Sequence, residues 1–155
     1  MAAKLISTGG SGLNEYLKKL TGLSRHPVSV GVHKSAGKHE GSDLTVAQVA
    51  AYNEFGTERI PERAAIRTSM RENKVENLLM IARIIKKISS GKGGNHRQAM
   101  GKVGMKVQND IQRKIVELKT PPNAQSTIDR KKSSNPLVDT GQLVNSIRWE
   151  YANND

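Results

Sequence analysis

A short string around Asp139 has the residue types of a catalytic site. Thr140 and Gly141 follow Asp139 and two apolar residues precede it, as around the catalytic aspartates of aspartic proteases, where two such strings bring together carboxylates that share a proton. A homodimer could supply both copies. Those proteases carry the string in a loop of a strand-rich fold, whereas residues 142–147 here have helical spacing. We therefore interpret Asp139 as a helix cap and not as a catalytic acid.

The Gly-rich string from Ser90 to Gly94 has part of the composition of a phosphate-binding loop. The first glycine of that motif is missing, neither Ser nor Thr follows Lys92, and a helix instead of a strand is expected before the string. These departures favour a flexible loop between two helices over a nucleotide site.

The chain contains four histidines and no cysteine. The histidines lack the helical pair spacing and the acidic partners that are typical of a metal site; they are His26, His33, His39 and His96. The absence of cysteine removes thiolate nucleophiles, disulfides and Cys-ligated zinc. We expect solvated histidines, no metal, no cofactor and no enzymatic activity.

The length of 155 residues favours a single domain, 1–155, because each of two halves would have too small a core. Hydrophobic residues make up 35% of the chain and aromatic residues only 3%, so the core is expected to be aliphatic and lean. A domain of this kind often completes its burial against neighbouring subunits. No segment approaches the roughly 20 apolar residues that span a bilayer, so we expect a soluble homo-oligomer without a membrane partner.

The net charge of +11 favours contact with nucleic acid, anionic lipid or an acidic protein surface. The charge is concentrated between Leu79 and Lys119, where ten basic and two acidic residues give a net charge of +8. This stretch lacks aromatic residues for base stacking, so sequence-specific recognition of nucleic acid is not expected. Non-specific contact with phosphates, docking on an acidic protein and simple solvation of a helix face remain open.

The first half of the chain alternates helical and extended patterns. Thr45 and Gln48 fit a capping box, and Gly56 suits the end of the helix that they begin. The spacing of apolar residues predicts, in order, a helix over 12–20, a strand over 28–32, a flexible loop over 34–43 and a short helix over 46–55.

A long amphipathic helix is the clearest pattern of the second half. Before it, Pro61 suits a helix start, and apolar residues continue at helical steps from Ile66 to Ile88 with an irregularity near Asn73. A flexible loop over 89–95 follows. The apolar stripe of the long helix then consists of Met100, Val103, Val107, Ile111, Ile115 and Leu118.

The C-terminal part predicts a loop, a short helix and a strand. Two prolines end the long helix and begin a basic, flexible loop over 120–136, with one helical turn around Ile128. Asp139 and Gln142 resemble a capping box for a helix that leads into a strand with Ile147, Trp149 and Tyr151 on one face. The whole pattern predicts an α+β fold of several helices, including the long central one, packed with a small, mostly antiparallel sheet.

Two surfaces are expected to face partners. The buried stripe of the long helix turns its basic residues outward, toward DNA or a neighbouring protein; these residues are Arg97, Lys102, Lys106 and Arg113. The apolar face of the last strand has few other strands to cover it. Trp149 and Tyr151 are therefore expected at a subunit interface.

Two strings of the chain resemble the signatures of one protein family. The first is Asn53-Glu54-Phe55-Gly56-Thr57 followed by Ile60-Pro61-Glu62-Arg63, and the second is Pro136-Leu137-Val138-Asp139-Thr140-Gly141-Gln142-Leu143 followed by Ser146-Ile147. In this order they are similar to the motifs of tailed-phage tail-completion and head-to-tail joining proteins, also described as virion morphogenesis proteins or minor tail components. The resemblance spans roughly residues 46–151. The chain departs from the family pattern at residues 64–65, where Pro-Phe is common, and in ending where many members add a hairpin.

This resemblance implies a structural subunit of the virion, located in the neck or at the top of the tail and assembled in the cytoplasm of the host bacterium. Such subunits form a homo-oligomeric ring, with six-fold symmetry favoured over twelve-fold symmetry. The ring joins a portal-side adaptor to the tail-terminator or tail-tube proteins and makes non-specific contact with packaged DNA. The resemblance implies no catalytic residues. The alternative function is that of a small basic protein that binds nucleic acid non-specifically and acts alone.

Overall fold

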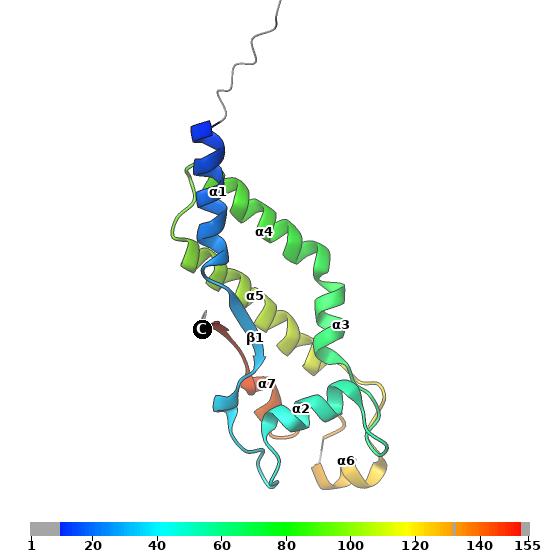
Figure 1. Cartoon of the computed structure of the whole chain (residues 1–155). Coiled ribbons are helices and arrows are strands. Elements are labelled where there is room, and N and C mark those ends of the chain that lie inside the picture. Colours follow the sequence, from blue (N-terminus) through cyan, green and yellow to red (C-terminus); the bar gives the residue numbers. More distant parts are fainter. Residues whose placement is uncertain (1–9, 132, 153–155) are drawn as a thin grey trace, which may run out of the picture.

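The computed structural model describes residues 10–131 and 133–152 of the chain. Within these residues the fold is α+β, with seven α-helices and a small antiparallel sheet, as the sequence predicts (Figure 1). The elements are α1 (Gly10–Ser24), β1 (Val28–Val32), a 3₁₀ turn (Lys34–Ala36), α2 (Val46–Phe55), α3 (Ala65–Glu72), α4 (Lys74–Ser89), α5 (His96–Glu117), α6 (Gln125–Lys131), α7 (Gln142–Ser146) and β2 (Ile147–Tyr151).

The long helix α5 is the centre of the molecule, and α1, α3, α4, α7 and both strands pack against it (Figure 1). Asn95 caps its first turn, because the side-chain Oδ1 accepts hydrogen bonds from the backbone of Arg97 and Gln98. The predicted stripe lies inward. Val103, Val107, Ile111 and Ile115 are buried, whereas Met100 and Leu118 at its two ends are half-buried.

The two strands pair in antiparallel register, with Val28 opposite Tyr151 and Val32 opposite Ile147. One face of the pair lies on α5. A Cβ atom added at Gly104 would lie 3.0 Å from the indole ring of Trp149, so this glycine permits the close approach of strand and helix. Much of the apolar face that the sequence leaves for a neighbouring subunit is therefore covered by α5 of the same chain.

Helix α2 begins and ends as its local sequence predicts. Gln48 N donates to Thr45 Oγ1 at 3.2 Å and Thr45 N donates to Gln48 Oε1 at 2.8 Å, which completes the capping box. Gly56 ends the helix with φ of 73°. A Cβ atom there would lie 3.1 Å from the backbone nitrogen of Glu62, so both the conformation and the space require glycine.

The prediction that Pro61 begins a helix is wrong. Residues 61–64 carry no helix, and α3 begins at Ala65. The backbone nitrogen of Arg63 donates to Asn53 O at 2.7 Å, so this segment is tied to the last turn of α2. The predicted irregularity near Asn73 is confirmed, because α3 ends and α4 begins there.

The prediction that Asp139 caps the short C-terminal helix is also wrong. Helix α7 begins at Gln142 after Gly141, which has φ of 80°, and no side chain caps it from that position. Asp139 is exposed, and the Gln142 side chain instead bridges Lys38 O and Glu40 N, at 3.1 and 2.9 Å. The Gln142 side chain thus bonds to a distant loop and not back to Asp139, and the backbone nitrogen of Gln142 donates to Thr140 Oγ1 at 3.4 Å.

The loop predicted over 120–136 contains α6, a helix of 7 residues, in place of a single turn. None of the helices in the described part of the chain combines the length and apolar composition needed to cross a membrane.

Candidate functional site

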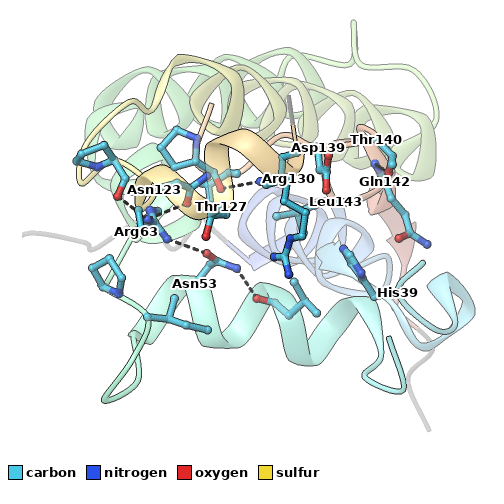
Figure 2. A pocket seen from close by; sticks show the side chains of 18 of the residues that line it. His39, Asn53, Arg63, Asn123, Thr127, Arg130, Asp139, Thr140, Gln142 and Leu143 are labelled. Atoms are coloured by element: carbon cyan, nitrogen blue, oxygen red, sulfur yellow. Dashed lines mark hydrogen bonds between the residues drawn. The ribbon is translucent and has the colours of Figure 1, made fainter. Parts of the chain in front are cut away.

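The two motif-like strings, far apart in the sequence, meet at one cavity of about 540 Å³ (Figure 2). We call it the motif cavity. The first string contributes Asn53, Ile60, Pro61 and Arg63, and the second contributes Pro136, Leu137, Asp139, Thr140, Gln142 and Leu143. Helix α6 and the segment before it form another part of the wall, with Asn123, Thr127, Arg130 and Lys131, and His39, Val49 and Arg59 also line the cavity.

Arg63 is the most buried charged residue of this cavity, with 5% of its surface exposed. Its guanidinium group donates to Pro121 O (2.8 Å), Pro122 O (2.9 Å), Asn123 Oδ1 (3.1 Å) and Asn53 Oδ1 (3.4 Å). All four acceptors are neutral. Burial away from water lowers the pKa of Arg63 below its ordinary value. Arg63 therefore ties the segment after α5 to α2 and leaves its positive charge uncompensated by these partners.

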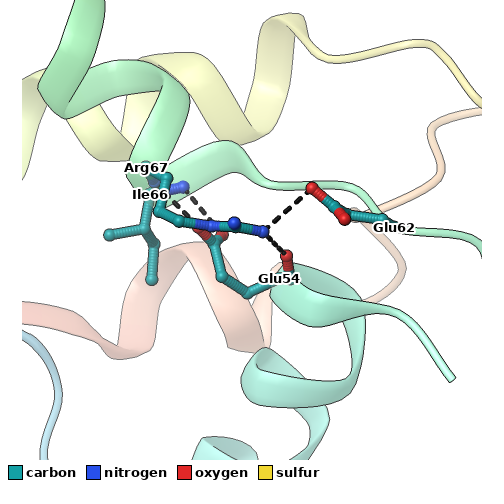
Figure 3. A network of polar contacts seen from close by, with 4 residues as sticks. All are labelled: Glu54, Glu62, Ile66 and Arg67. Atoms are coloured by element: carbon teal, nitrogen blue, oxygen red, sulfur yellow. Dashed lines mark hydrogen bonds and ion pairs between the residues drawn. The ribbon is translucent and has the colours of Figure 1, made fainter.

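Glu54 is the second buried charge of the first string, with 6% of its surface exposed (Figure 3). Its carboxylate accepts hydrogen bonds from the backbone nitrogens of Ile66 (2.9 Å) and Arg67 (2.8 Å) at the start of α3. The Arg67 side chain also donates to Glu54 and to Glu62. A negative charge satisfies free N–H groups at a helix start, so Glu54 acts as a long-range cap for α3.

The walls of the motif cavity carry four basic residues and, among the described residues, a single acidic one, Asp139. The basic residues are Arg59, Arg63, Arg130 and Lys131. Burial lowers the pKa of Lys131; the charge of Asp139 opposes this change, and the charges of Arg63 and Arg130 add to it. The site is electropositive, and it can bind an acceptor or an anion by hydrogen bonding and charge.

Two of the predicted outward cations of α5 are engaged in ion pairs. Lys106 lies 2.7 Å from Asp110 and 3.1 Å from Glu76 of α4, and Arg113 lies 2.8 Å from Asp110. Burial lowers the pKa of Lys106, but the hydrogen bonds and charges of Asp110 and Glu76 outweigh it, and the pKa is raised overall. The pair with Glu76 joins α4 to α5, and all three pairs reduce the charge offered to a partner.

The other two predicted cations lie near the start of α5. Arg97 stacks over the ring of Tyr151 at 4.4 Å, and the Tyr151 hydroxyl donates to Arg97 O at 2.8 Å. Lys102 is exposed and lines a groove of about 380 Å³ between α4 and α5. The basic residues of this groove are Arg83, Lys87, Lys92 and Lys102, and no acidic residue lines it in the described parts of the chain.

The Gly-rich string over residues 90–94 forms the loop at this groove, as predicted. A Cβ atom at Gly93 would lie 2.5 Å from the backbone of Ile88, so the glycine lets the loop fold against the end of α4. The composition that suggests a phosphate loop thus has a packing reason.

The prediction of solvated histidines is wrong for His33. Its side chain is 14% exposed, and it contacts Glu150 Oε1 at 2.7 Å and Arg148 O at 3.0 Å, which ties the loop after β1 to β2. His96 packs against Gly22 of α1. Among residues 10–131 and 133–152, no group of three His, Cys, Asp or Glu side chains could hold a metal ion.

Comparison of the chain with protein-family models, with curated proteins and with solved structures found no match.

The motif cavity itself was not predicted from the sequence. Each string shows only its local turns and helix ends, and Arg63 gives no sign that three of its four acceptors lie 58 to 60 residues away. The signal that could have found the cavity is the occurrence of charged residues inside otherwise apolar strings, since such residues need partners elsewhere. Arg97, Lys102, Lys106 and Arg113 lie outside this cavity.

Proposed function

We propose that this chain is a structural subunit of a tailed phage, which assembles into a ring in the neck or at the top of the tail and joins the tail to the head. One observation carries the proposal. The charged residues of the first family-like string, Glu54 and Arg63, use their hydrogen bonds to hold α2, α3 and the segment after α5 together. The strings that resemble the phage family therefore have an architectural role, as expected of an assembly subunit.

A second feature supports assembly with other copies. Helix α4 buries Asn77 and Ile88 on one side, yet the exposed side of its first half carries apolar residues. We call these residues the α4 stripe; its members are Val75, Leu78 and Leu79, which are 69%, 55% and 50% exposed. A surface helix normally presents polar residues to water, so an apolar outer face is typical of an interface.

The partner that best fits the α4 stripe is another copy of this chain. Ring contacts are heterologous, so each subunit needs two different complementary surfaces. A separate apolar surface lies on α2, where Phe55 is 67% and Tyr52 37% exposed. The α4 stripe of one copy would pack against this α2 surface of the next.

The test is the oligomeric state of the purified full chain, measured by native mass spectrometry and by negative-stain electron microscopy. We expect closed rings, with six copies favoured over twelve. A triple variant of the α4 stripe, Val75→Gln with Leu78→Gln and Leu79→Gln, should be monomeric because glutamine keeps the helix propensity and removes the apolar surface. The matched control on the same helix is Arg83→Gln with Lys86→Gln and Lys87→Gln, which should assemble. A wild-type monomer at all concentrations would argue against the proposal.

Non-specific nucleic-acid binding is the second candidate, and the groove of Arg83, Lys87, Lys92 and Lys102 favours it. Such a protein would bind duplex DNA as a monomer. The logarithm of its binding constant would fall linearly with the logarithm of the salt concentration, with a slope of about −0.9 for each phosphate contacted. Tight DNA binding by the monomeric stripe variant would support this candidate over the ring subunit.

A further inference from the structure

The motif cavity has more hydrogen-bond donors than acceptors to receive them. The side chains of Arg59 and Arg130 are exposed and make no hydrogen bond or ion pair with any other described residue. Asn123 Nδ2 is buried and has no acceptor within the described residues. Arg63 also lines the cavity and is bonded only to neutral oxygens. The buried donors of Asn123 and Arg63 and the unpaired guanidinium groups beside them favour a negatively charged acceptor.

Apolar residues form much of the remaining wall. These apolar residues include Val49, Ile60, Leu137 and Leu143. Figure 2 shows the Arg130 side chain extending into the cavity, with Asp139 beside it. A ligand that fits must therefore carry both a negative charge and an apolar part.

We infer that the motif cavity binds a carboxylate side chain on an extended, acidic and partly apolar segment of a partner protein. Arg130 supplies a free planar guanidinium group, which matches a carboxylate with two parallel hydrogen bonds. The buried charge of Arg63 lines the same cavity. A carboxylate on a single extended chain can enter a recessed cavity, whereas the phosphates of duplex DNA lie on a broad convex surface. The inference rests on the proposed function for the nature of the partner, an adjoining layer of the neck or tail.

Asp139 has a specific place in this proposal. It is the acidic residue of the cavity wall, and its charge already acts on Lys131. An incoming carboxylate meets repulsion from Asp139 and attraction from Arg130. Removal of the Asp139 charge should strengthen binding, and reversal of the Arg130 charge should weaken it. Damage to the fold would weaken binding in both variants, so the opposite signs separate recognition from structure.

The experiment uses two blocked hexapeptides, one that alternates leucine with aspartate and one that alternates leucine with asparagine. Each is titrated into the full chain and followed by NMR, with the side-chain amide of Asn123 and the Nε–H of Arg63 and Arg130 as reporters. We expect the aspartate peptide to bind and to shift these reporters. Arg130→Glu should lower the affinity roughly tenfold or more, because a charged hydrogen bond is lost. Asp139→Asn should raise the affinity several-fold.

The control is Arg83→Glu, which makes the same change of charge on α4, outside the motif cavity. It should bind the aspartate peptide as the wild type does. The inference would be overturned if the two peptides bound equally well. It would also be overturned if Arg83→Glu and Arg130→Glu lowered the affinity for the aspartate peptide equally. Reporters that shift with inorganic phosphate but not with the aspartate peptide would overturn it as well.

Ring formation of Arg130→Glu, measured by native mass spectrometry, separates this inference from the proposed function. Rings that form normally but no longer bind the aspartate peptide support both. Rings in the wild type without peptide binding would contradict the cavity proposal alone. Circular dichroism checks that the variant is folded, and Arg130→Lys, which keeps the charge but not the planar fork, should lose only part of the affinity.

Discussion

The two ends of the molecule differ in the polar contacts that hold them together. At the lower end of Figure 1, buried polar groups add to the apolar core: Arg63 joins α2 to the segment before α6, and Glu54 joins α2 to α3. At the upper end, α1 contacts α4 and α5, and α4 lies on α5 through apolar residues and the Glu76–Lys106 ion pair. The irregular segments 56–64 and 118–124 lack the backbone ladders of regular structure, so side chains must satisfy their polar groups.

This difference suggests that the two ends of the molecule have different roles. Polar contacts with fixed geometry specify one arrangement of the lower end, and they are costly to break. The upper end keeps an apolar stripe on α4 that the described part of the chain leaves exposed. The polar contacts of the first region therefore fix its own arrangement, and the exposed stripe of the second can bind a neighbour.

The largest effect is expected from Arg63→Met, which removes four hydrogen bonds to acceptors of the lower end. The loss of stability should be roughly 2–4 kcal/mol, because oxygens bonded to a charged donor lose their partner. Arg67→Met is the matched control: its side chain is 52% exposed, so it should cost about 1 kcal/mol or less. Urea denaturation measures both. If the two variants lost the same free energy of unfolding, the burial of Arg63 would not explain its contribution to the lower end.

Gly104→Val tests the contact between α5 and the sheet. The added side chain would overlap the ring of Trp149, which an added Cβ already approaches to 3.0 Å. Overpacking of this kind should cost roughly 1–3 kcal/mol. Gly94→Val is the control, because nothing lies within 4 Å of a Cβ atom there. A thermal melt in which both variants resemble the wild type would show that the sheet is not held against α5 as described.

Glu54→Gln tests the long-range cap of α3. The amide retains one acceptor oxygen but loses the negative charge that faces two backbone N–H groups. We expect the free energy of unfolding, measured by urea denaturation, to fall by roughly 1–2 kcal/mol. Glu58→Gln, for which no hydrogen bond to another described residue is found, should change the stability by less than about 0.5 kcal/mol. A loss in Glu54→Gln no larger than in this control would show that α3 does not need the cap.

The smallest effect on stability is expected at the upper end, from Leu78→Gln in the α4 stripe. Leu78 is 55% exposed, so its replacement should change the stability of the monomer by about 0.5 kcal/mol or less. Its effect on assembly, measured by size-exclusion chromatography with light scattering, should be much larger. A variant that loses stability without any change in assembly would reverse the roles given to the two ends.

The sequence predicts those features whose causes lie within a few residues of each other. The capping box of Thr45 and Gln48, the turn at Gly56 and the buried stripe of α5 all follow from local spacing, and all are found in the structure. The alternation of residues also predicts both strands, β1 and β2.

The predictions from sequence are wrong where a side chain bonds to a residue far along the chain and not to a local one. Helix α3 does not begin at Pro61, because its start is capped by Glu54, 12 residues before Ile66. Asp139 follows the pattern of a cap, yet Gln142 bonds to a loop more than 100 residues away. The motif cavity depends on such contacts throughout, so local patterns indicate its residues without showing that they meet.

The most direct test of the proposed function is electron microscopy of lysates from a phage with a nonsense mutation in the gene for this chain. A missing adaptor ring leaves the surfaces above and below it without a complementary partner, while shells and tubes can still form. We expect separate DNA-filled heads together with unattached or misterminated tails, and joined particles when the chain is supplied from a plasmid. Normally joined virions in the mutant, or a lysate without any structural proteins, would contradict the account.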